Sequence, residues 1–453
     1  MFPHAVRLAL ALVIATFFAG CGGGGSSASP PAGGLTLVAS DGQIVVSWND
    51  DSNVQYDLWY SSNADVAACQ NANGAFPAGC QFHIQVTSPY VITGLVNGVS
   101  YYFVMNARKN GGPAGDDTPI ASATPTLAGD TWQPGGAMGS ADMHGIVYGT
   151  NVQNAVSSYV AVGNAGAIYN STNGTSWTPV SSPTGNNLNA AAYAQNNFIA
   201  AGAAGSIFYS PDALTWTAAP SNTAQTLNAL GNNAGLAKCY GILVGTVSQT
   251  DYFTSPSTCG FSGSRGNNAS LTVAVGDSGT VLYSSNGGVA WTTATSPTAN
   301  NLYGVAFSAG VTKWVAVGAG GTMISSTDGI NWTTVTSPTT SDLFSIAVLA
   351  STNAATLGTT YTFVAVGAGG TILTSNDGVT WVSQTVSPAA NLHAVTGWSR
   401  FVAVGDGGAA FTSADGTTWT SVASGTTSTL YGVLGAYGQY NAIGQGGASV
   451  YSK

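Results

Sequence analysis

The sequence predicts an all-β protein, with a small β-sandwich followed by a seven-bladed β-propeller that is closed by its own N-terminal strand. Two observations lead to this fold class. First, Gly accounts for 61 of 453 residues, strand-forming aromatic residues are frequent, and all 17 acidic residues are Asp. Long helices favour Glu, Lys, Leu and Arg, so helical bundles are not expected. Second, the C-terminal part repeats itself with a period of roughly 40 residues.

The charge balance excludes several functions. Lys and Arg together number 8, the net charge is -9, and charged residues make up 6% of the chain, against roughly 25% in an average globular protein. Nucleic-acid binding requires clustered cations, so we do not expect it. The histidines lie far apart and lack metal-ligand spacing, so we expect no metal and no cofactor. These histidines are His4, His83, His144 and His393.

Residues 1–20 have the pattern of a signal peptide, with Arg7 preceding an apolar run from Leu8 to Ala19. The run is too short to span a bilayer. It ends at Cys21 in a sequence that resembles a bacterial lipobox, which implies that Cys21 is lipidated. An ordinary signal peptide is the alternative. Residues 21–33 are a Gly/Ser/Pro-rich flexible linker. Gly22, where retained lipoproteins carry Asp, suggests the outer membrane of a Gram-negative bacterium.

The other four cysteines form two pairs that are close in sequence, Cys69 with Cys80 and Cys239 with Cys259. In an oxidising compartment such pairs indicate two short-range disulfides. This agrees with a location in the cell envelope.

Residues 34–126 alternate apolar and polar residues in short runs separated by Gly, Asn, Asp and Pro, which is typical of a β-sandwich. Leu95 is followed six residues later by Tyr101. This run resembles the tyrosine corner of fibronectin type III domains. The resemblance covers about 90 residues and implies a spacer that holds the next domain away from the membrane.

Residues 127–453 repeat one pattern: a strand ending in Gly, a turn, a strand running into Ser, an Asp/Asn turn and a Trp. The glycines stand 39, 74, 42, 49, 38 and 39 residues apart. They are Gly163, Gly202, Gly276, Gly318, Gly367, Gly405 and Gly444.

The two ends of this region are incomplete repeats. Trp132 lacks a preceding strand, and Gly444 lacks a following Trp. The two ends therefore complete one another if the N-terminal strand enters the last blade, as in a closed propeller. The long interval marks an insertion at about 230–268. An eighth blade is the alternative, because residues 242–245 resemble the strand before the glycine.

The Asp/Asn turns resemble the Asp-box of sialidase-like propellers, and together with the Val-Gly strands they resemble the propellers of photosystem II assembly factors. The resemblance implies a structural role, in which the Asp or Asn accepts backbone N–H bonds and the Trp packs between blades. The Asp-box residues are Asn173, Asp212, Asn286, Asp328, Asp377 and Asp415.

We expect no catalytic residues. A sialidase uses three arginines and a Tyr/Glu pair, whereas this region has only Arg265 and Arg400 and no Glu. Glycoside hydrolysis by two carboxylates would require paired Asp, and nothing in the sequence pairs them. Photosystem assembly factors use a basic patch that this acidic chain lacks.

Binding is the preferred function. The predicted inner strands open with His144, Asn189, Asn228, Tyr303, Phe344, His393 and Tyr431 at equivalent positions. Aromatic and amide side chains at one opening suit a glycan or a peptide. The candidate ligand-binding residues are His144, Tyr303, Phe344, His393, Tyr431, Asp277 and Asp406.

The expected partner is therefore an envelope protein or a glycan, and contact with the membrane is through the lipid anchor only. Two other functions remain open. One is a polysaccharide hydrolase or lyase with its site in the central opening. The other is a structural surface or matrix component that associates with itself.

Overall fold

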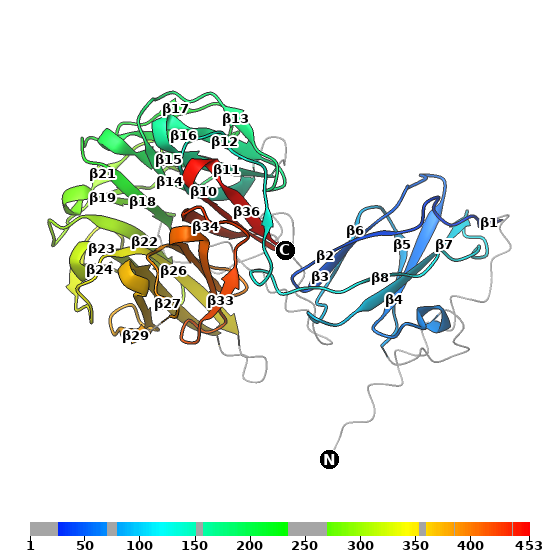
Figure 1. Cartoon of the computed structure of the whole chain (residues 1–453). Helices are drawn as coiled ribbons and strands as arrows, with labels where there is room; N and C mark the ends of the chain where they lie inside the picture. The colour runs from blue at the N-terminus through cyan, green and yellow to red at the C-terminus, as the bar shows by residue number, and fades with distance from the viewer. Residues whose placement is uncertain are drawn as a thin grey trace, which may run out of the picture. The chain divides into compact units, whose positions relative to one another are not determined.

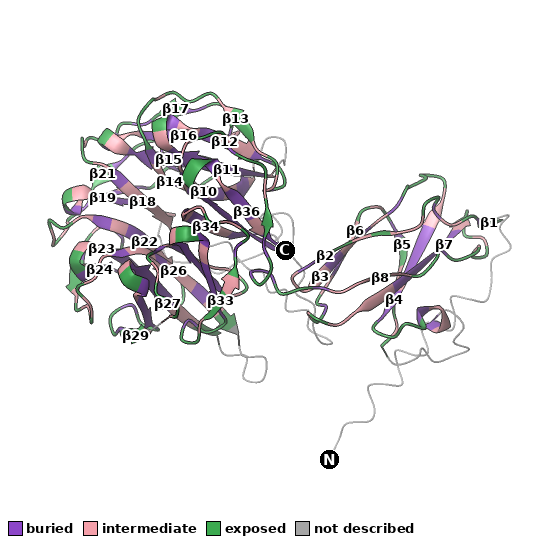
Figure 2. Ribbon diagram, viewed as in Figure 1, coloured by how far each residue is buried: buried purple, intermediate pink, exposed green. Residues whose placement is uncertain are grey.

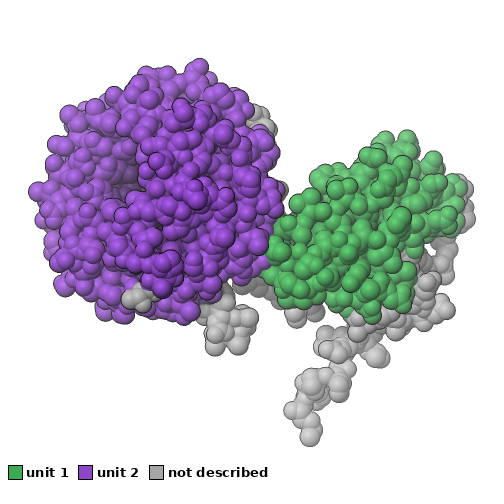
Figure 3. Space-filling model, in the orientation of Figure 1, with its two compact units in different colours: residues 1–126 green, residues 127–453 purple. Residues whose placement is uncertain are grey.

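The computed structural model describes residues 26–69, 79–150, 157–233, 270–352, 359–384, 386–436 and 438–453. The chain divides into two compact units, residues 1–126 and 127–453 (Figure 3). Strands account for nearly all regular structure in both units (Figure 1). Within the described ranges, no helix has the length and apolar character that crossing a bilayer requires.

Unit 1 contains two antiparallel sheets, one of order β2-β3-β6 and one of order β1-β7-β4-β5, with β8 added beside β7. Their bounds are β1 (Ser26–Ala28), β2 (Thr36–Ser40), β3 (Gln43–Ser47), β4 (Gln55–Ser61), β5 (Gln81–Val86), β6 (Tyr90–Thr93), β7 (Tyr101–Lys109) and β8 (Ala121–Ala123). Residues from both sheets, including Ile44, Leu58 and Phe103, form one buried core. The hydroxyl of Tyr101 accepts a hydrogen bond from the N–H of Val96 at 3.0 Å.

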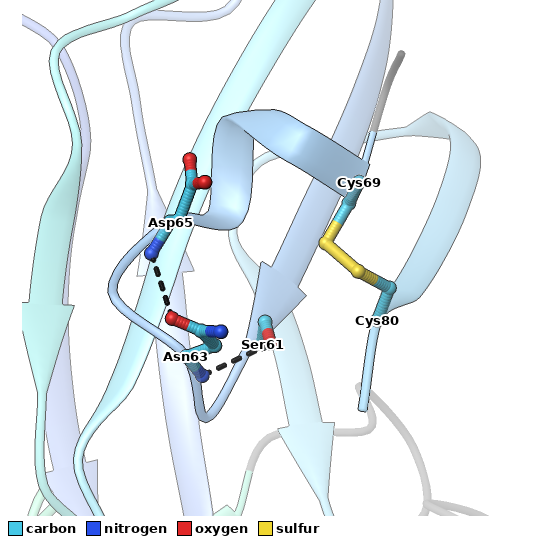
Figure 4. Close-up of a disulfide and its surroundings, with 5 residues drawn as sticks. All are labelled: Ser61, Asn63, Asp65, Cys69 and Cys80. Carbon is cyan, nitrogen blue, oxygen red and sulfur yellow. Dashed lines mark hydrogen bonds between the residues drawn. A yellow bond between two sulfur atoms is a disulfide. The ribbon is translucent and has the colours of Figure 1, made fainter. Parts of the chain in front are cut away.

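A disulfide joins Cys69 to Cys80, as the sequence predicts, with a Cα–Cα distance of 5.7 Å (Figure 4). Cys69 ends the short 3-10 helix η1 (Val66–Cys69). Two hydrogen bonds hold the turn that leads into this helix. The N–H of Asn63 donates to Ser61 Oγ, and the N–H of Asp65 donates to Asn63 Oδ1. The predicted pair Cys239 and Cys259 lies outside the described residues, as does Cys21.

Unit 2 contains seven four-stranded antiparallel sheets within its described residues. From first to fourth strand, the first four sheets are β10 (Met143–Thr150), β11 (Ser157–Gly163), β12 (Ile168–Ser171) and β13 (Thr178–Val180); β14 (Leu188–Ala194), β15 (Asn197–Gly202), β16 (Ile207–Ser210) and β17 (Thr217–Ala218); β18 (Leu227–Asn232), β19 (Thr272–Gly276), β20 (Val281–Ser284) and β21 (Thr292–Thr293); and β22 (Leu302–Ser308), β23 (Lys313–Gly318), β24 (Met323–Ser326) and β25 (Thr333–Val335).

The last three sheets are β26 (Leu343–Thr352), β27 (Thr359–Gly367), β28 (Ile372–Ser375) and β29 (Val382–Gln384); β30 (Leu392–Gly397), β31 (Phe401–Gly405), β32 (Ala409–Ser413) and β33 (Thr420–Ala423); and β34 (Leu430–Ala436), β35 (Gln439–Gly444), β36 (Ser449–Ser452) and β9 (Gln133–Pro134).

The first strands of successive sheets pack against one another in the order β10, β14, β18, β22, β26, β30 and β34, and β34 packs against β10. The seven sheets therefore form a ring in which each first strand is the inner one. The second strands are the most buried, and every residue of β19 and β31 is buried. Figure 2 shows the buried residues of unit 2 in purple.

The last sheet joins the two ends of unit 2. Its outer strand β9 comes from the beginning of the unit and pairs with β36, Pro134 opposite Val450 and Gln133 opposite Tyr451. The incomplete first and last repeats of the sequence thus share one sheet. The predicted insertion lies between β18 and β19, where residues 234–269 are outside the described ranges.

The Asp-box turns follow the third strand of a sheet and are held by side-chain hydrogen bonds. In one of them, Oδ1 of Asp328 accepts the N–H groups of Ile330 and Asn331 and the hydroxyl of Ser326. Trp332 of this turn is buried in a cluster with Val273 and Val275 of the preceding sheet. The turn and its tryptophan therefore hold neighbouring sheets together.

The Asp-box carboxylates predict a loss of stability in acid. Burial alone would raise the pKa of Asp328, Asp377 and Asp415. The hydrogen bonds that these carboxylates accept from N–H and hydroxyl groups outweigh this effect and lower the pKa from 3.8 to about 2. The unfolded chain therefore takes up protons first, so this stabilisation is complete above pH 3.8 and is lost as the pH falls toward about 2. Denaturant midpoints measured across this range test the prediction. The effect is modest because the carboxylates are solvent-exposed.

The control for this prediction is a triple variant in which Asp328, Asp377 and Asp415 are replaced by Asn. Two other boxes already carry Asn at this position, Asn173 and Asn286, and Asn173 Oδ1 accepts the same two N–H bonds. We expect the variant to fold and to lose much of the pH dependence. An unchanged pH dependence would show that these three carboxylates do not cause the loss of stability in acid.

Candidate functional site

The inner strand of every sheet in the ring carries a β-bulge at its second residue. In β10, Met143 lies opposite Gly163 and Gly145 opposite Val162, so that His144 has no partner in the register. A bulge breaks the alternation of a strand and redirects a side chain. The bulged residues are His144, Asn189, Asn228, Tyr303, Phe344, His393 and Tyr431.

These seven residues, which we call the bulge ring, line one cavity of about 360 Å³ where the inner strands begin. Each is half-buried. The residue before each of them, Met143 in β10 and Leu in the other six inner strands, is buried. The local sequence thus anchors one side chain in the wall and turns the next toward the cavity.

Five members of the bulge ring form a continuous aromatic arc across neighbouring sheets. The ring centroids of Tyr303 and Phe344 are 6.0 Å apart, and those of Phe344 and His393 are 5.5 Å apart. Tyr431 follows at 5.3 Å from His393, and His144 at 5.1 Å from Tyr431. The aromatic arc therefore extends over the inner strands β22, β26, β30, β34 and β10 along the cavity wall.

Two asparagines complete the bulge ring. Asn189 donates through Nδ2 to the carbonyl of Leu227 at 3.1 Å. Asn228 donates to the carbonyl of Leu302 at 3.1 Å and to Oδ1 of Asp277 at 2.9 Å. Each amide is thus tied to the inner strand of the next sheet, which fixes its orientation at the cavity wall.

The third residue of each inner strand is small because the strands approach one another closely. A Cβ on Gly145 would lie 2.7 Å from the N of Ala191, and one on Gly432 would lie 2.6 Å from the carbonyl oxygen of His144. These contacts are with the backbone of the neighbouring inner strand, so side chains of ordinary size are excluded. The residues are Gly145, Ala190, Ala229, Gly304, Ser345, Ala394 and Gly432.

The fourth residue of each inner strand gives the cavity an apolar layer below the bulge ring. In every sheet this residue is aliphatic. The seven residues are Ile146, Ala191, Leu230, Val305, Ile346, Val395 and Val433. The cavity therefore combines an aromatic and amide ring with an apolar layer, as small-molecule sites commonly do.

Short 3-10 turns surround this end of the ring. They are η2 (Asn164–Gly166), η3 (Ala203–Gly205), η5 (Asp277–Gly279), η6 (Ala319–Gly321), η7 (Ala368–Gly370), η8 (Asp406–Gly408) and η9 (Gln445–Gly447). In several sheets the middle N–H of the turn donates to the side chain just before the next inner strand, as Gly320 does to Asp342 at 2.7 Å. The same bond from Gly446 to Asp142, at 2.8 Å, joins the last sheet to the first.

Two of the turns place a carboxylate behind the bulge ring. Asp406 Oδ1 lies 2.6 Å from Nε2 of His393, and Asp406 Oδ2 accepts from Asn391 at 2.8 Å. The hydrogen bond with His393 is the main reason that the pKa of Asp406 lies below its ordinary value. Burial raises the pKa of the Tyr431 hydroxyl, and the charges of Asp142 and Asp406 raise it further. The charges of Asp142 and Asp406 therefore act on this part of the cavity wall.

The structure brings together five of the seven ligand-binding residues named from the sequence: His144, Tyr303, Phe344, His393 and Tyr431. The other two, Asp277 and Asp406, do not line the cavity and instead orient Asn228 and His393. Asn189 and Asn228 line the cavity but were not among the candidates, although their position in the repeat is the same. The aliphatic layer was also missed, because its residues look like ordinary strand core.

Among the residues that the structure describes, no three His, Cys, Asp or Glu side chains form a cluster that could hold a metal ion.

Neither a protein-family model nor a curated protein matches the chain. Solved propeller structures do resemble it. One, described as the WD40 β-propeller domain of Doa1, has a TM-score of 0.50 and 9% identity, covering 72% of this chain and 97% of that one. Another, described as YCF48 bound to D1 peptide, has a TM-score of 0.49 and 14% identity, covering 72% and 94%. At 9% identity the likeness to the Doa1 domain shows the fold alone, and it confirms an all-β chain with a β-propeller.

The close approach of the inner strands predicts that Gly145→Ala is strongly destabilising. The added methyl group would meet the backbone of Ala190 and Ala191 at 2.7–3.0 Å, and overpacking of this kind costs about 1–3 kcal/mol of unfolding free energy. Urea unfolding of the propeller, followed by Trp fluorescence, measures the change.

The matched control for Gly145→Ala is Gly185→Ala. A Cβ at Gly185 meets nothing within 4 Å, so the unfolding free energy should change by no more than about 0.5 kcal/mol. Equal effects of the two substitutions would show that the inner strands do not constrain this position.

Proposed function

We propose that the protein is a non-enzymatic binding module whose ligand, or a side group of it, enters the central cavity of the propeller. The observation that carries this proposal is the bulge ring, in which seven equivalent positions present their side chains to one cavity. Five of them bear aromatic or imidazole rings in mutual contact. Bulges next to a site are a recognised way of aiming side chains.

The size and chemistry of the cavity support this proposal. Its volume of about 360 Å³ lies near the lower end of the range for ligand pockets, roughly 300–1,000 Å³. Such a cavity accommodates a small molecule or one group of a larger partner. The aromatic arc provides stacking, and the aliphatic layer below it provides apolar burial. An envelope protein or a glycan remains the proposed partner.

Binding is favoured over catalysis because the nearby carboxylates have structural partners. Asp142 accepts the N–H of Gly446, Asp342 accepts that of Gly320, and Asp406 is bonded to His393 and Asn391. None of these three Asp residues is among those that line the cavity. A polysaccharide hydrolase or lyase remains the alternative, and a self-associating structural component of the surface or matrix is a further one.

We also propose the setting in which this module works. The chain is a lipoprotein anchored through Cys21 to the outer membrane of a Gram-negative bacterium, on its periplasmic or surface face. Residues 34–126 form a fibronectin type III-like spacer, which is supported by the bond between Tyr101 and Val96. The propeller has seven blades, which is supported by the seven sheets of the described residues. The insertion at about 230–268 that the sequence predicts is part of this proposal.

The proposal predicts that ligand capture depends on the aromatic arc. The purified full chain in detergent is immobilised and exposed to a glycan array and to native envelope extract. Tyr303→Ala and Tyr431→Ala should reduce saturable binding at least about tenfold, since each removes a stacking surface from the cavity wall.

The control for this experiment is Tyr451→Ala, because Tyr451 lies on β36 and does not line the cavity. This variant should bind as the unmodified protein does. If all three variants capture the same ligand equally well, the ligand binds elsewhere and the proposal is wrong. Cleavage of a bound glycan would favour the enzymatic alternative.

A further inference from the structure

We infer that the central cavity recognises an organic ammonium group, with the aromatic arc as its cage and the surrounding carboxylates as its counter-charge. This inference rests on the proposed function and specifies the ligand's chemistry. It combines three observations: the arrangement of the rings, the absence of Lys and Arg from the described residues of the cavity lining, and the position of the acidic residues.

The rings provide the first part of the argument. Tyr303, Phe344 and Tyr431 are aromatic residues of the cavity lining, and the neighbouring centroids in the arc are 5.1–6.0 Å apart. A cation within about 6 Å of the face of such a ring is attracted by the ring quadrupole. Several rings that border one small cavity attract the same cation together, which is how aromatic cages hold alkylammonium groups.

The distribution of cations provides the second part. Among the described residues that line the cavity there is no Lys or Arg. In the described part of unit 2, these residues are Lys313, Arg400 and Lys453. Lys313 pairs with Ser308 at the far end of the seven-residue strand β22, roughly 20 Å from the residue that opens the strand. Arg400 lies in the corresponding connection between β30 and β31, where it is paired with Asp130.

The acidic residues provide the third part. Four carboxylates lie at the cavity end of the ring: Asp142 and Asp342 directly before inner strands, and Asp277 and Asp406 at the start of 3-10 turns. Asp406 balances any charge on His393, its ion-pair partner at 2.6 Å. The effect of Asp142 and Asp406 on the pKa of Tyr431 shows that their field reaches the bulge ring. This field attracts a cation and repels an anion.

A charge-isostere pair tests the inference directly. Choline and 3,3-dimethyl-1-butanol have the same shape, but only choline is charged. Calorimetric titration of the full chain at low ionic strength should give choline at least about tenfold tighter binding. Equal or tighter binding of the neutral alcohol would overturn the inference.

Substitutions separate the ring faces from simple apolar contact. Phe344→Leu keeps apolar bulk and removes the π-face, so it should weaken choline binding about fivefold and leave the alcohol unaffected. Asp406→Asn should weaken choline binding and reduce its salt dependence. The matched controls are Tyr451→Leu, outside the cavity, and Asp117→Asn, an exposed carboxylate in unit 1. Neither control should alter choline binding.

The same measurement identifies the carrier of the ammonium group. A Lys-containing tripeptide and a glucosamine disaccharide are each compared with their N-acetylated forms. Weaker binding after acetylation in either pair supports the inference, and equal binding in both pairs contradicts it. If choline fails to bind while Tyr303→Ala still abolishes capture of the envelope ligand, the ammonium inference is wrong and the proposed function stands. If both results are negative, both proposals are wrong.

Discussion

The close approach of seven inner strands around one axis is the constraint on which the site depends. At Gly145, Gly304 and Gly432, the third residues of three inner strands, an added Cβ would lie 2.6–3.0 Å from the backbone of the neighbouring strand. The equivalent residues of the other four sheets are Ala or Ser. The bulge just before this position redirects the second residue toward the cavity. Repetition of this geometry in seven sheets places one side chain per sheet at the cavity wall, and its identity differs between sheets. The backbone supplies the cavity, and the identities of these seven residues determine its chemistry.

The rest of the propeller keeps the inner strands in place. Asp-box turns and their tryptophans join adjacent sheets on the far side, as Trp332 does with Val273 and Val275. Bonds such as that between Gly320 and Asp342 join them at the cavity end. The hydrogen bond from Gly446 to Asp142 and the strand pairing of β9 with β36 join the last sheet to the beginning of the unit. Each sheet is therefore held by a neighbour on both sides. The inner strands that carry the bulge ring are therefore held in place both on the Asp-box side and at the cavity end.

Much of this was predictable from the sequence because each repeat fixes its own register. The glycine that ends each second strand and the Trp after each Asp-box place the inner strand, so His144 and Tyr431 could be recognised as equivalent. Asp277 and Asp406, also named as candidates, instead bond to Asn228 and His393, since the direction of a side chain in a 3-10 turn is not encoded by spacing. Ile146 and its equivalents were missed because an aliphatic residue has the same pattern in a cavity wall as in a buried core. Tertiary contacts, such as the ion pair of His393 and Asp406, have no signal in a repeat.

The central claim is that the bulge ring is where the ligand binds. A crystal structure of the full chain with the ligand retained by the capture experiment tests this claim most directly. The account predicts ligand atoms within van der Waals contact of Tyr303, Phe344 and Tyr431, with the Asp-box side unoccupied. Ligand bound on the Asp-box side, or on residues 34–126, with the central cavity free of it, would contradict the account.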